Sequence, residues 1–417
     1  MTITIVITFC TLLLIAYVFD LTSAKTKVPS VIFLLLLGWS VRKLTVLIDL
    51  PLPDFSPFLP VLGTIGLILI VLEGSLELEL NKSKFGLIGK SFLGALLPII
   101  ALAFIFAFAF RYFGDYSLRD SIVNAIPFCV ISSAIAIPSV RNLQSHNKEF
   151  VIYESSLSDI LGVLLFNFLA FNEVITASSF GYFAFQLLII AVVSFIATIG
   201  LSFLLNKIEH HVKFVPIILL VVLIYAVSEI YHLPALIFIL IFGLAIGNLD
   251  ELKKFEWIKR FKPEDLNTEV TKFKELTTEA AFLIRAIFFI LFGYLIETIE
   301  VINTDTFIWS LGVVICIFAV RAIQLKLSKL PLRPLLFVAP RGLITILLFL
   351  SIAPPKSIPF VNNSLVIQVI ILTALVMMIG LMTNKTQKPE LEKNQDTLSQ
   401  GPQSLEIFKN KNSSQKV

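Results

Sequence analysis

Long apolar segments recur along the whole chain, and they restrict it to a membrane-embedded helical fold. Hydrophobic residues make up 57% of the 417 residues and charged residues only 15%, whereas a soluble protein of this length carries about 25% charge. Many segments approach the ~20 apolar residues that a helix needs to cross a ~30 Å hydrocarbon core. The stretches between them are too short for a separate soluble domain. The pattern predicts an all-α, polytopic membrane protein.

Hydropathy and turn residues divide the chain into thirteen predicted spans. Cys10, Cys129 and Cys316 lie in apolar segments at irregular spacing, which predicts neither a disulfide framework nor a metal cluster. The N-terminus lacks the basic start and small-residue cleavage site of a signal peptide, so it is predicted to form the first span. We expect one transmembrane domain over 1–383 and a polar, disordered cytoplasmic tail over 384–417. The predicted spans are 2–19, 28–41, 58–76, 86–110, 120–140, 150–172, 182–205, 214–230, 233–248, 278–297, 306–325, 334–353 and 363–383.

Lysine and arginine residues are distributed unevenly between alternate loops. With the N-terminus outside, the inner loops and the tail contain 25 of the 33, and the outer loops contain five. This distribution agrees with the positive-inside rule for membrane proteins. Because one missing or additional span would invert every later loop, the distribution also supports thirteen spans. We expect a multi-pass protein of the cell membrane, with its N-terminus outside and its C-terminus in the cytoplasm.

Two carboxylates lie within the apolar segment 150–172, where a charge at the centre of a membrane helix costs about 2.5–3.5 kcal/mol. On a helix, Ser155 and Asp159 lie one turn apart on one face, and Glu154 and Ser158 lie on a neighbouring face. A carboxylate with a hydroxyl above it offers the oxygen ligands that hard cations prefer. The alternative is a boundary effect, with Glu154 near a helix end and Asp159 extending toward water. Ion binding explains the pattern better.

The fifth predicted span carries two prolines that interrupt a helix. Pro127 and Pro138 flank Ser132 and Ser133. A proline frees the carbonyl four residues earlier, and hydroxyl groups can satisfy the opened backbone. Free carbonyls beside two hydroxyls form a cation site when they line a cavity, although proline kinks also occur in membrane helices without a function.

The twelfth predicted span provides a counterpart, because Pro340-Arg341-Gly342 breaks it near its middle. Two interrupted helices in corresponding halves indicate a transport site between inverted repeats. We therefore predict inverted repeats with two crossed, broken helices. Arg341 is always charged, so half-helix C-termini or a carboxylate are expected to offset its burial. An arginine that extends to the membrane surface fits poorly with apolar sequence on both sides.

Two further charged residues fall within predicted spans. Glu73, late in the third span, either lines a cytoplasmic funnel that attracts cations or simply sits at a helix end. Arg285, in the tenth span, either pairs with a carboxylate in the core or extends to the inner surface. Both residues, together with Ser158, are candidates for pathway or supporting roles.

These motifs together resemble the cation:proton antiporter superfamily, nearer to its sodium/proton exchanger branch. Residues 153–159 (Tyr-Glu-Ser-Ser-Leu-Ser-Asp) are similar to the Gly-Glu-Ser-x-x-Asn-Asp signature of that branch, and 340–343 to its Gly-Leu-Arg-Gly element. Residues 29–38 resemble its second-helix pattern, and 72–77 the Gly-Leu-Glu ending of its third helix. The resemblance covers about 1–383. The Glu-Ser…Asp and Arg-Gly elements are its more specific parts.

The resemblance implies a role for each residue at the site. Asp159 is expected to be the essential carboxylate that binds either a proton or the transported Na⁺, assisted by Ser155. Glu154 is expected to pair with Arg341 and to hold the broken helices in position. The resemblance also implies a homodimer whose core domain moves like an elevator.

The implied sodium/proton antiporter fold places core helices at about 58–172 and 278–383 and dimerisation helices in the remainder. The chain departs from the family pattern at two places. Ser158 replaces the usual Asn before the Asp, which leaves one carboxylate in the pair, as in exchangers expected to be electroneutral. Ser132 and Ser133 replace the Thr-Asp of the crossed helix, which changes the ligands around the ion.

The function expected from the residues and the resemblance is secondary antiport of a monovalent cation, Na⁺ before Li⁺ or K⁺, against H⁺. Competition at one buried carboxylate predicts electroneutral exchange. The alternatives are K⁺/H⁺ antiport and an organic-anion/Na⁺ symporter of the same fold. A membrane-embedded enzyme is disfavoured because Gly-x-Ser-x-Gly, His-Glu-x-x-His and any intramembrane histidine are missing. The expected partners are the transported ions, the lipid bilayer and a second copy, with no cofactor and no nucleic acid.

Overall fold

A computed structural model describes residues 2–26, 28–49, 53–79, 82–141, 143–172, 174–207, 214–248 and 263–383. Within these ranges the chain forms helices joined by short connections and contains no β-strand. The predicted disordered tail over 384–417 lies outside the described residues. The α-helices are α1 (Thr2–Thr26), α2 (Ser30–Leu47), α3 (Phe58–Glu77), α4 (Phe85–Gly114), α5 (Leu118–Cys129), α6 (Ser133–Ser139), α7 (Ser145–Phe171), α8 (Ala177–Lys207), α9 (Phe214–Ile230), α10 (Ala235–Gly247), α12 (Pro263–Leu295), α13 (Thr298–Ile302), α14 (Thr304–Leu327), α15 (Leu343–Leu350) and α16 (Asn363–Thr383), and the short 3₁₀ turns are η1 (Lys82–Lys84), η3 (Leu335–Phe337) and η4 (Pro354–Lys356).

The helices account for the thirteen predicted spans. In the described chain, nine helical segments are long and apolar enough to cross a bilayer, one of which is α5 together with α6. Two shorter apolar helices, α9 and α10, and the 27-residue α7 add three more. The interrupted segment formed by η3 and α15 completes the set. The prediction of an all-α, multi-span fold is therefore confirmed.

The second helix extends further than hydropathy predicts. The predicted span ends at residue 41, before two basic residues, whereas α2 continues to Leu47. The reason is that the guanidinium of Arg42 donates hydrogen bonds to the carbonyls of Tyr294 (3.3 Å) and Leu295 (3.0 Å). It also forms an ion pair with Glu297 at 3.0 Å. Because the charge of Arg42 is neutralised at the end of α12, α2 can continue past this residue.

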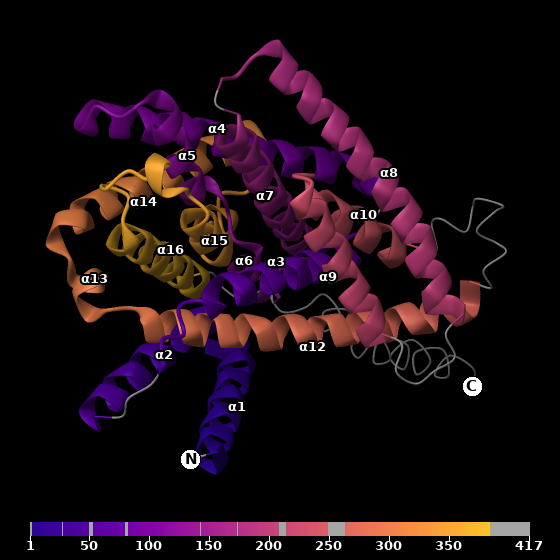
Figure 1. Ribbon diagram of the computed structural model, residues 1–417, viewed down its shortest axis with the longest axis horizontal. Helices are drawn as coiled ribbons and strands as arrows, with labels where there is room; N and C mark the ends of the chain where they lie inside the picture. The colour runs from indigo at the N-terminus through magenta and orange to yellow at the C-terminus, as the bar shows by residue number, and fades with distance from the viewer. Residues whose placement is uncertain are drawn as a thin grey trace, which may run out of the picture.

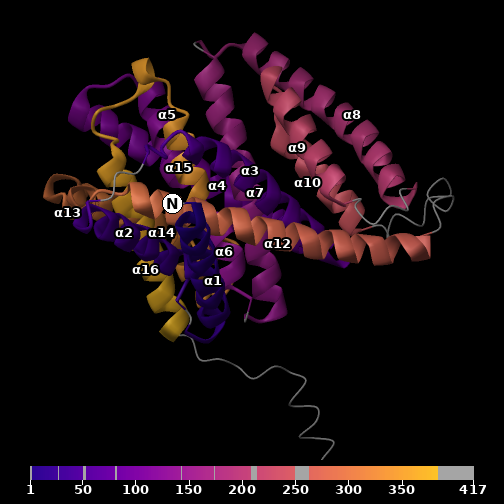
Figure 2. The same ribbon diagram turned by 60° about the horizontal axis from the view of Figure 1, so that its bottom comes forward.

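The helices form two groups that α12 connects. Helices α4 to α7 pack with α14, α15 and α16, and helices α8, α9 and α10 pack with one another. Helix α12 runs beneath both groups, and α1 and α2 lie on its opposite side (Figure 1). Turned by 60°, the molecule shows α8 to α10 on one side and α14 and α16 on the other (Figure 2). Helix α3 contacts α10 and α12 as well as α6, α7 and α15, so it lies between the groups.

Small residues allow the closest helix crossings. A Cβ atom at Gly38 of α2 would lie 2.0 Å from the Ile290 carbonyl of α12, and one at Gly293 would lie 2.3 Å from the Leu35 carbonyl of α2. Helix α10 carries a Gly-x-x-x-Gly pattern at Gly243 and Gly247, which faces the end of α3 in the same way. In membranes, such small-residue faces bring backbones into direct contact. These contacts hold α2 against α12, and α10 against the end of α3.

Candidate ion-binding site

Two interrupted helices cross at the centre of the first group. Helix α5 ends at Cys129 and α6 begins at Ser133, with extended backbone between them. On the other segment, η3 ends at Phe337 and α15 begins at Leu343. The backbone N–H of Ser132 donates to the carbonyl of Pro340 at 2.9 Å, which joins the two extended stretches. The predicted pair of crossed, broken helices is present.

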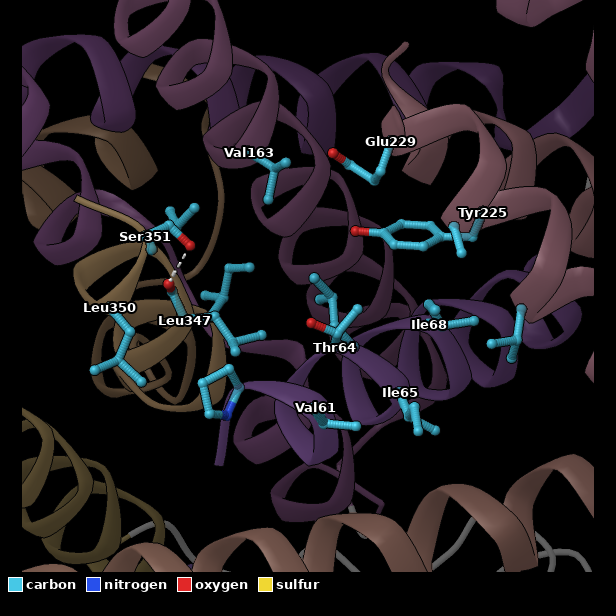
Figure 3. Close-up of a pocket in the computed structure, with 16 residues that line it drawn as sticks. Val61, Thr64, Ile65, Ile68, Val163, Tyr225, Glu229, Leu347, Leu350 and Ser351 are labelled. Carbon is cyan, nitrogen blue, oxygen red and sulfur yellow. Dashed lines mark hydrogen bonds between the residues drawn. The ribbon is translucent and has the colours of Figure 1, made fainter. Parts of the chain in front are cut away.

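A cavity of about 620 Å³ lies beside this crossing and separates α9 from α3 and α15 (Figure 3). Its wall is mostly apolar. Thr64 of α3, Val163 of α7 and Leu347 of α15 line one side. Tyr225 and Glu229 of α9 face them across the cavity (Figure 3). Because Val163 is one helical turn after Asp159, the cavity reaches the part of α7 that carries the candidate carboxylate.

Arg341 is buried at the crossing, with 1% of its surface exposed. Its guanidinium donates to the carbonyls of Phe128 (2.5 Å) and Cys129 (3.3 Å), which end α5, and to that of Ala339 (2.9 Å). The last carbonyls of a helix have no intrahelical partner and carry partial negative charge, so they stabilise a cation. The sequence predicted that either a half-helix C-terminus or a carboxylate offsets the buried charge of Arg341. In the structure, the C-terminus of α5 does so.

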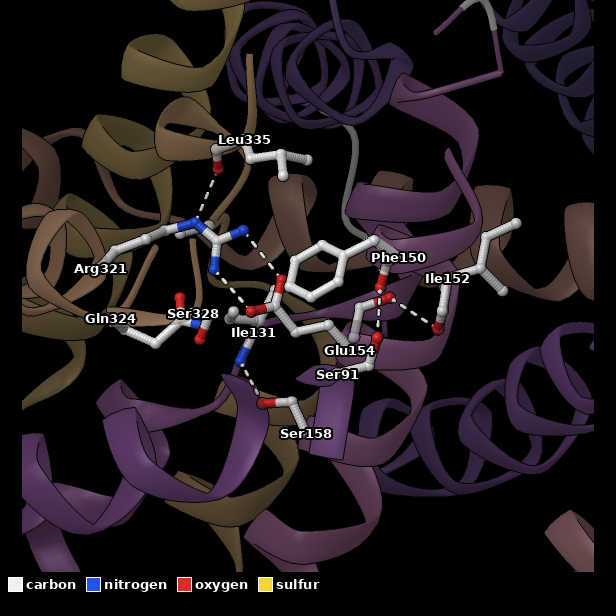
Figure 4. Close-up of polar contacts among 12 residues, drawn as sticks. Ser91, Ile131, Phe150, Ile152, Glu154, Ser158, Arg321, Gln324, Ser328 and Leu335 are labelled. Atoms are coloured by element: carbon white, nitrogen blue, oxygen red, sulfur yellow. Dashed lines mark hydrogen bonds and ion pairs between the residues drawn. The ribbon is translucent and has the colours of Figure 1, made fainter. Parts of the chain in front are cut away.

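The predicted ion pair between Glu154 and Arg341 is wrong, because Glu154 binds Arg321 of α14 instead (Figure 4). The two guanidinium nitrogens of Arg321 donate to the two carboxylate oxygens of Glu154 at 2.9 and 2.8 Å. Both side chains are almost fully buried. Arg321 Nε also donates to the carbonyl of Leu335 at 2.7 Å. The pair therefore ties α7 to α14 and to the start of the interrupted segment.

Arg321 is the residue of the candidate site that sequence reasoning missed. It lies within the predicted span 306–325. An arginine inside an apolar span indicates a buried charge, so the sequence pointed to Arg321 as strongly as to Arg341. Spacing along the chain does not give the rotation of α14 about its axis, so it does not decide which arginine reaches α7. The structure decides it, because Arg321 donates to both carboxylate oxygens of Glu154, whereas the guanidinium of Arg341 donates to three backbone carbonyls.

Asp159 belongs to α7, and its side chain lies against the first residue of α6. It is 2% exposed. Its Oδ2 accepts a hydrogen bond from the backbone N–H of Ser133 at 3.3 Å and a short one from the Ser133 hydroxyl. Ser133 is the first residue of α6, so the carboxylate sits where a helix presents free N–H groups and positive potential. The other oxygen, Oδ1, has no hydrogen-bond partner in the described chain.

The other predicted serines take different positions. The hydroxyl of Ser158 accepts a hydrogen bond from the backbone N–H of Ile131 at 2.9 Å and so satisfies the break in the crossed helix (Figure 4). Ser155 is buried, but its hydroxyl donates to the Ile152 carbonyl at 3.5 Å rather than to Asp159. Ser132 is buried at the N-cap position of α6 and joins the two extended stretches through its backbone. Ser133, and not Ser155, is the hydroxyl in contact with Asp159.

Glu73 and Arg285 form a second buried pair. Arg285 of α12 lies 3.8 Å from the carboxylate of Glu73 near the end of α3, and both side chains are buried. Of the alternatives for Arg285, pairing with a core carboxylate is the one that the structure contains. Glu73 is therefore not an isolated charge at a helix end, because a cation lies beside it.

The family model described as "Sodium/hydrogen exchanger, transmembrane" matches residues 9–386, nearly the whole chain. The chain belongs to this family. A member of the sodium/hydrogen exchanger family is a multi-pass membrane transporter and not an enzyme, and it exchanges a cation for protons. The predicted resemblance is confirmed.

Solved structures agree on the fold of this exchanger. A structure of the sodium proton antiporter MjNhaP1 from Methanocaldococcus jannaschii at pH 8 matches with a TM-score of 0.60 and 17% sequence identity, over 92% of this chain and 96% of that one. An electron-microscopy map of the same antiporter matches with a TM-score of 0.64 and 17% identity, over 93% of this chain and 100% of that one. A comparison with curated proteins gave no match.

The buried carboxylates of the exchanger differ in their partners. Among the described residues, Glu73, Glu154 and Asp159 are the acidic side chains that are fully buried. Arg285 accompanies Glu73 and Arg321 accompanies Glu154. Within the described part of the chain, Asp159 contacts no basic side chain and keeps one oxygen without a hydrogen bond. A buried carboxylate without a counter-ion is the group whose charge a bound cation or proton would neutralise.

Proposed function

We propose that this exchanger transports Na⁺ against H⁺ at Asp159, one ion for one proton. The observation that carries the proposal is the contrast between the three buried carboxylates: Glu73 and Glu154 have arginine partners, and Asp159 has none among the residues that the structure describes. A buried charge without a partner is costly, so Asp159 favours states in which a proton or a cation neutralises it. Both need the same carboxylate oxygens, so they compete.

The surroundings of Asp159 suit a small hard cation. Such ions take oxygen ligands, and the Ser133 hydroxyl already touches Asp159. The hydroxyl can rotate so that its oxygen faces the ion while the carboxylate oxygen Oδ1 supplies a further ligand. We propose Ser132 and Ser155 as additional ligands, from the start of α6 and from the turn of α7 before Asp159.

The remaining charges of the core have supporting roles in this proposal. The Glu154–Arg321 pair connects α7 to α14 and to Leu335. Arg341 holds the end of α5 against the second interrupted segment. Neither contact includes Asp159, so both can persist through a transport cycle. One carboxylate then carries the exchange, which is the basis for electroneutral transport.

We also propose the setting in which the protein works. The distribution of lysine and arginine supports a place in the cell membrane with the N-terminus outside and the C-terminus in the cytoplasm. We propose a homodimer in which a core at about 58–172 and 278–383 moves relative to the remaining helices. The packing of α8, α9 and α10 with one another supports this division, and α10 also packs against α3 at its boundary.

The experiment uses purified protein in proteoliposomes that contain a pH-sensitive dye. Pulses of Na⁺, Li⁺ and K⁺ are added in turn, and the proton flux is recorded for the wild type and for Asp159→Asn. We expect the wild type to respond to Na⁺ and the variant to respond to none of the ions, with an unchanged elution profile in detergent. Ser156→Ala is the matched control, because Ser156 is buried on the same helix and does not contact Asp159.

Three outcomes would contradict parts of the proposal. Wild-type flux from Asp159→Asn would exclude the carboxylate as the transport group. A response to K⁺ without a response to Na⁺ would make the protein a K⁺/H⁺ antiporter. Cation uptake without proton movement, dependent on an organic anion, would indicate a symporter instead.

A further inference from the structure

One carboxylate lies in the cavity beside the crossing and is not part of the site described above. Glu229 and Tyr225 are one turn apart on α9, and both side chains point into the cavity (Figure 3). Glu229 is half-buried and forms no ion pair with a lysine or arginine of the described chain. It is also the one acidic residue in the cavity lining. The Tyr225 hydroxyl donates a hydrogen bond to its carboxylate, and His232 lies near enough to interact with its charge. The carboxylate otherwise faces a mostly apolar space.

The cavity lies at one end of the helix bundle. Thr64 belongs to the first two turns of α3, Glu229 to the last turn of α9, and Ser351 follows the end of α15. Val163 of α7 lines the inner wall, one turn beyond Asp159. Because four residues of a helix rise about 6 Å, the cavity extends from this end of the bundle toward the depth of Asp159.

The opposite end of α3 has a different charge balance. Glu73 is nine residues after Thr64, about 14 Å along the helix axis. There the carboxylate is paired with Arg285 at 3.8 Å, and the charges of Asp20, Glu77 and Arg141 also act on it. On the cavity side no arginine or lysine accompanies Glu229 in the described lining. A cation that approaches the site through the cavity therefore meets the carboxylate of Glu229, which is not paired with a lysine or arginine of the described chain.

We propose that the cavity between α9, α3 and α15 is an access vestibule in which Glu229 concentrates monovalent cations on one side of the transport site. The inference rests on the proposed cation/proton exchange. It adds Glu229 to the residues involved and places its effect on one side of the transport site. A carboxylate beside low-dielectric walls focuses its potential into the space that the walls enclose. Glu229 is not a ligand of the ion at Asp159. It raises the cation concentration in the space that leads there.

The first test measures the potential in the cavity without transport. Cys10, Cys129 and Cys316 are replaced by Ala, and Thr64→Cys introduces one thiol in the lining. The rates of modification by a cationic and by a neutral methanethiosulfonate are compared with Glu229 present and in Glu229→Gln. We expect the ratio of cationic to neutral rate to fall about three- to tenfold in the variant. An unchanged ratio would overturn the proposal even if exchange itself is intact.

The second test measures transport from each side separately. Right-side-out and inverted membrane vesicles give the half-saturating Na⁺ concentration on the two faces. We expect Glu229→Gln to raise this concentration about three- to tenfold on the cavity side, with the maximal rate and the opposite face unchanged. Glu229→Asp should restore the wild-type value. Added choline chloride at ~0.5 M should raise the wild-type value toward that of the variant, because salt screens the charge.

Asp305→Asn is the matched control, because Asp305 is an exposed carboxylate at the start of α14 and outside the cavity lining. It should leave every value unchanged. A loss of maximal rate in Glu229→Gln, or an equal change on both faces, would show a structural role instead and contradict the vestibule. If the wild type shows no cation-dependent proton flux, the proposed exchange fails, and the thiol-modification ratio still decides the charge of the cavity.

Discussion

Replacing Glu154 by glutamine tests which arginine it pairs with and what the pair contributes. The carboxylate accepts two hydrogen bonds from Arg321, at 2.9 and 2.8 Å, and both side chains are at most 2% exposed. In Glu154→Gln the Arg321 guanidinium stays buried with no opposite charge. Breaking one side of a buried pair costs about 3–5 kcal/mol, because the remaining charge is left uncompensated.

This cost corresponds to a measurable change in melting temperature. For a chain of 417 residues, the unfolding entropy is roughly 0.9 kcal/mol/K. A loss of about 4 kcal/mol then lowers the melting temperature by about 4–5 °C. Because Glu154 does not contact Asp159, the half-saturating Na⁺ concentration should change much less than the stability does.

The assay is thermal unfolding in detergent, followed by tryptophan fluorescence, for single and double variants. Glu154→Gln and Arg321→Gln together should be more stable than the sum of the two single losses predicts, because the double variant leaves no unpaired charge. Glu154→Gln with Arg341→Gln should show a much smaller coupling, because Glu154 interacts less strongly with Arg341 than with Arg321. Coupling to Arg341 instead of Arg321 would refute the assigned pair. A variant that keeps its melting temperature and loses Na⁺ binding would make Glu154 a ligand.

Three further predictions concern the transport site. Ser133→Ala removes the hydroxyl that contacts Asp159 and should raise the half-saturating Na⁺ concentration about tenfold, whereas Ser155→Ala should change it less, as measured by dye dequenching. Lowering the pH should raise the half-saturating Na⁺ concentration without changing the maximal rate, because protons occupy the same carboxylate; a maximal rate that falls instead would exclude simple competition. Exchange should be insensitive to a potential clamped with valinomycin, and a steep voltage dependence would reveal a second titrating group.

Much of the architecture could be predicted from the sequence because its signals are local. Hydropathy located the spans, and the second segment is interrupted over 338–342, which includes the predicted break at Pro340-Arg341-Gly342. In the first segment the break begins after Cys129, two residues past Pro127. A proline removes one backbone donor and clashes with the preceding turn, and that effect depends little on the rest of the fold.

The partners of the buried charges could not be predicted in the same way. Which arginine reaches Glu154 depends on the rotation and depth of α14, and those are set by packing over the whole bundle. The same limit applies to Ser155, which lies on the predicted face of α7 but turns toward the Ile152 carbonyl. Glu229 carried a weak signal, since it lies at the end of a short apolar helix, where a charge is ordinary.

The joint between the two interrupted helices has a consequence for acid tolerance. It depends on the Ser132 N–H and the Pro340 carbonyl, on the Arg341 guanidinium and the carbonyls that end α5, and on the hydroxyl of Thr373, which accepts from the Arg341 N–H at 3.0 Å. Neither backbone groups nor a hydroxyl gain or lose protons near neutral pH, and the guanidinium remains charged. In the proposed exchange, acidification of the cell would therefore change which ion occupies Asp159, while the joint that positions this carboxylate keeps its shape.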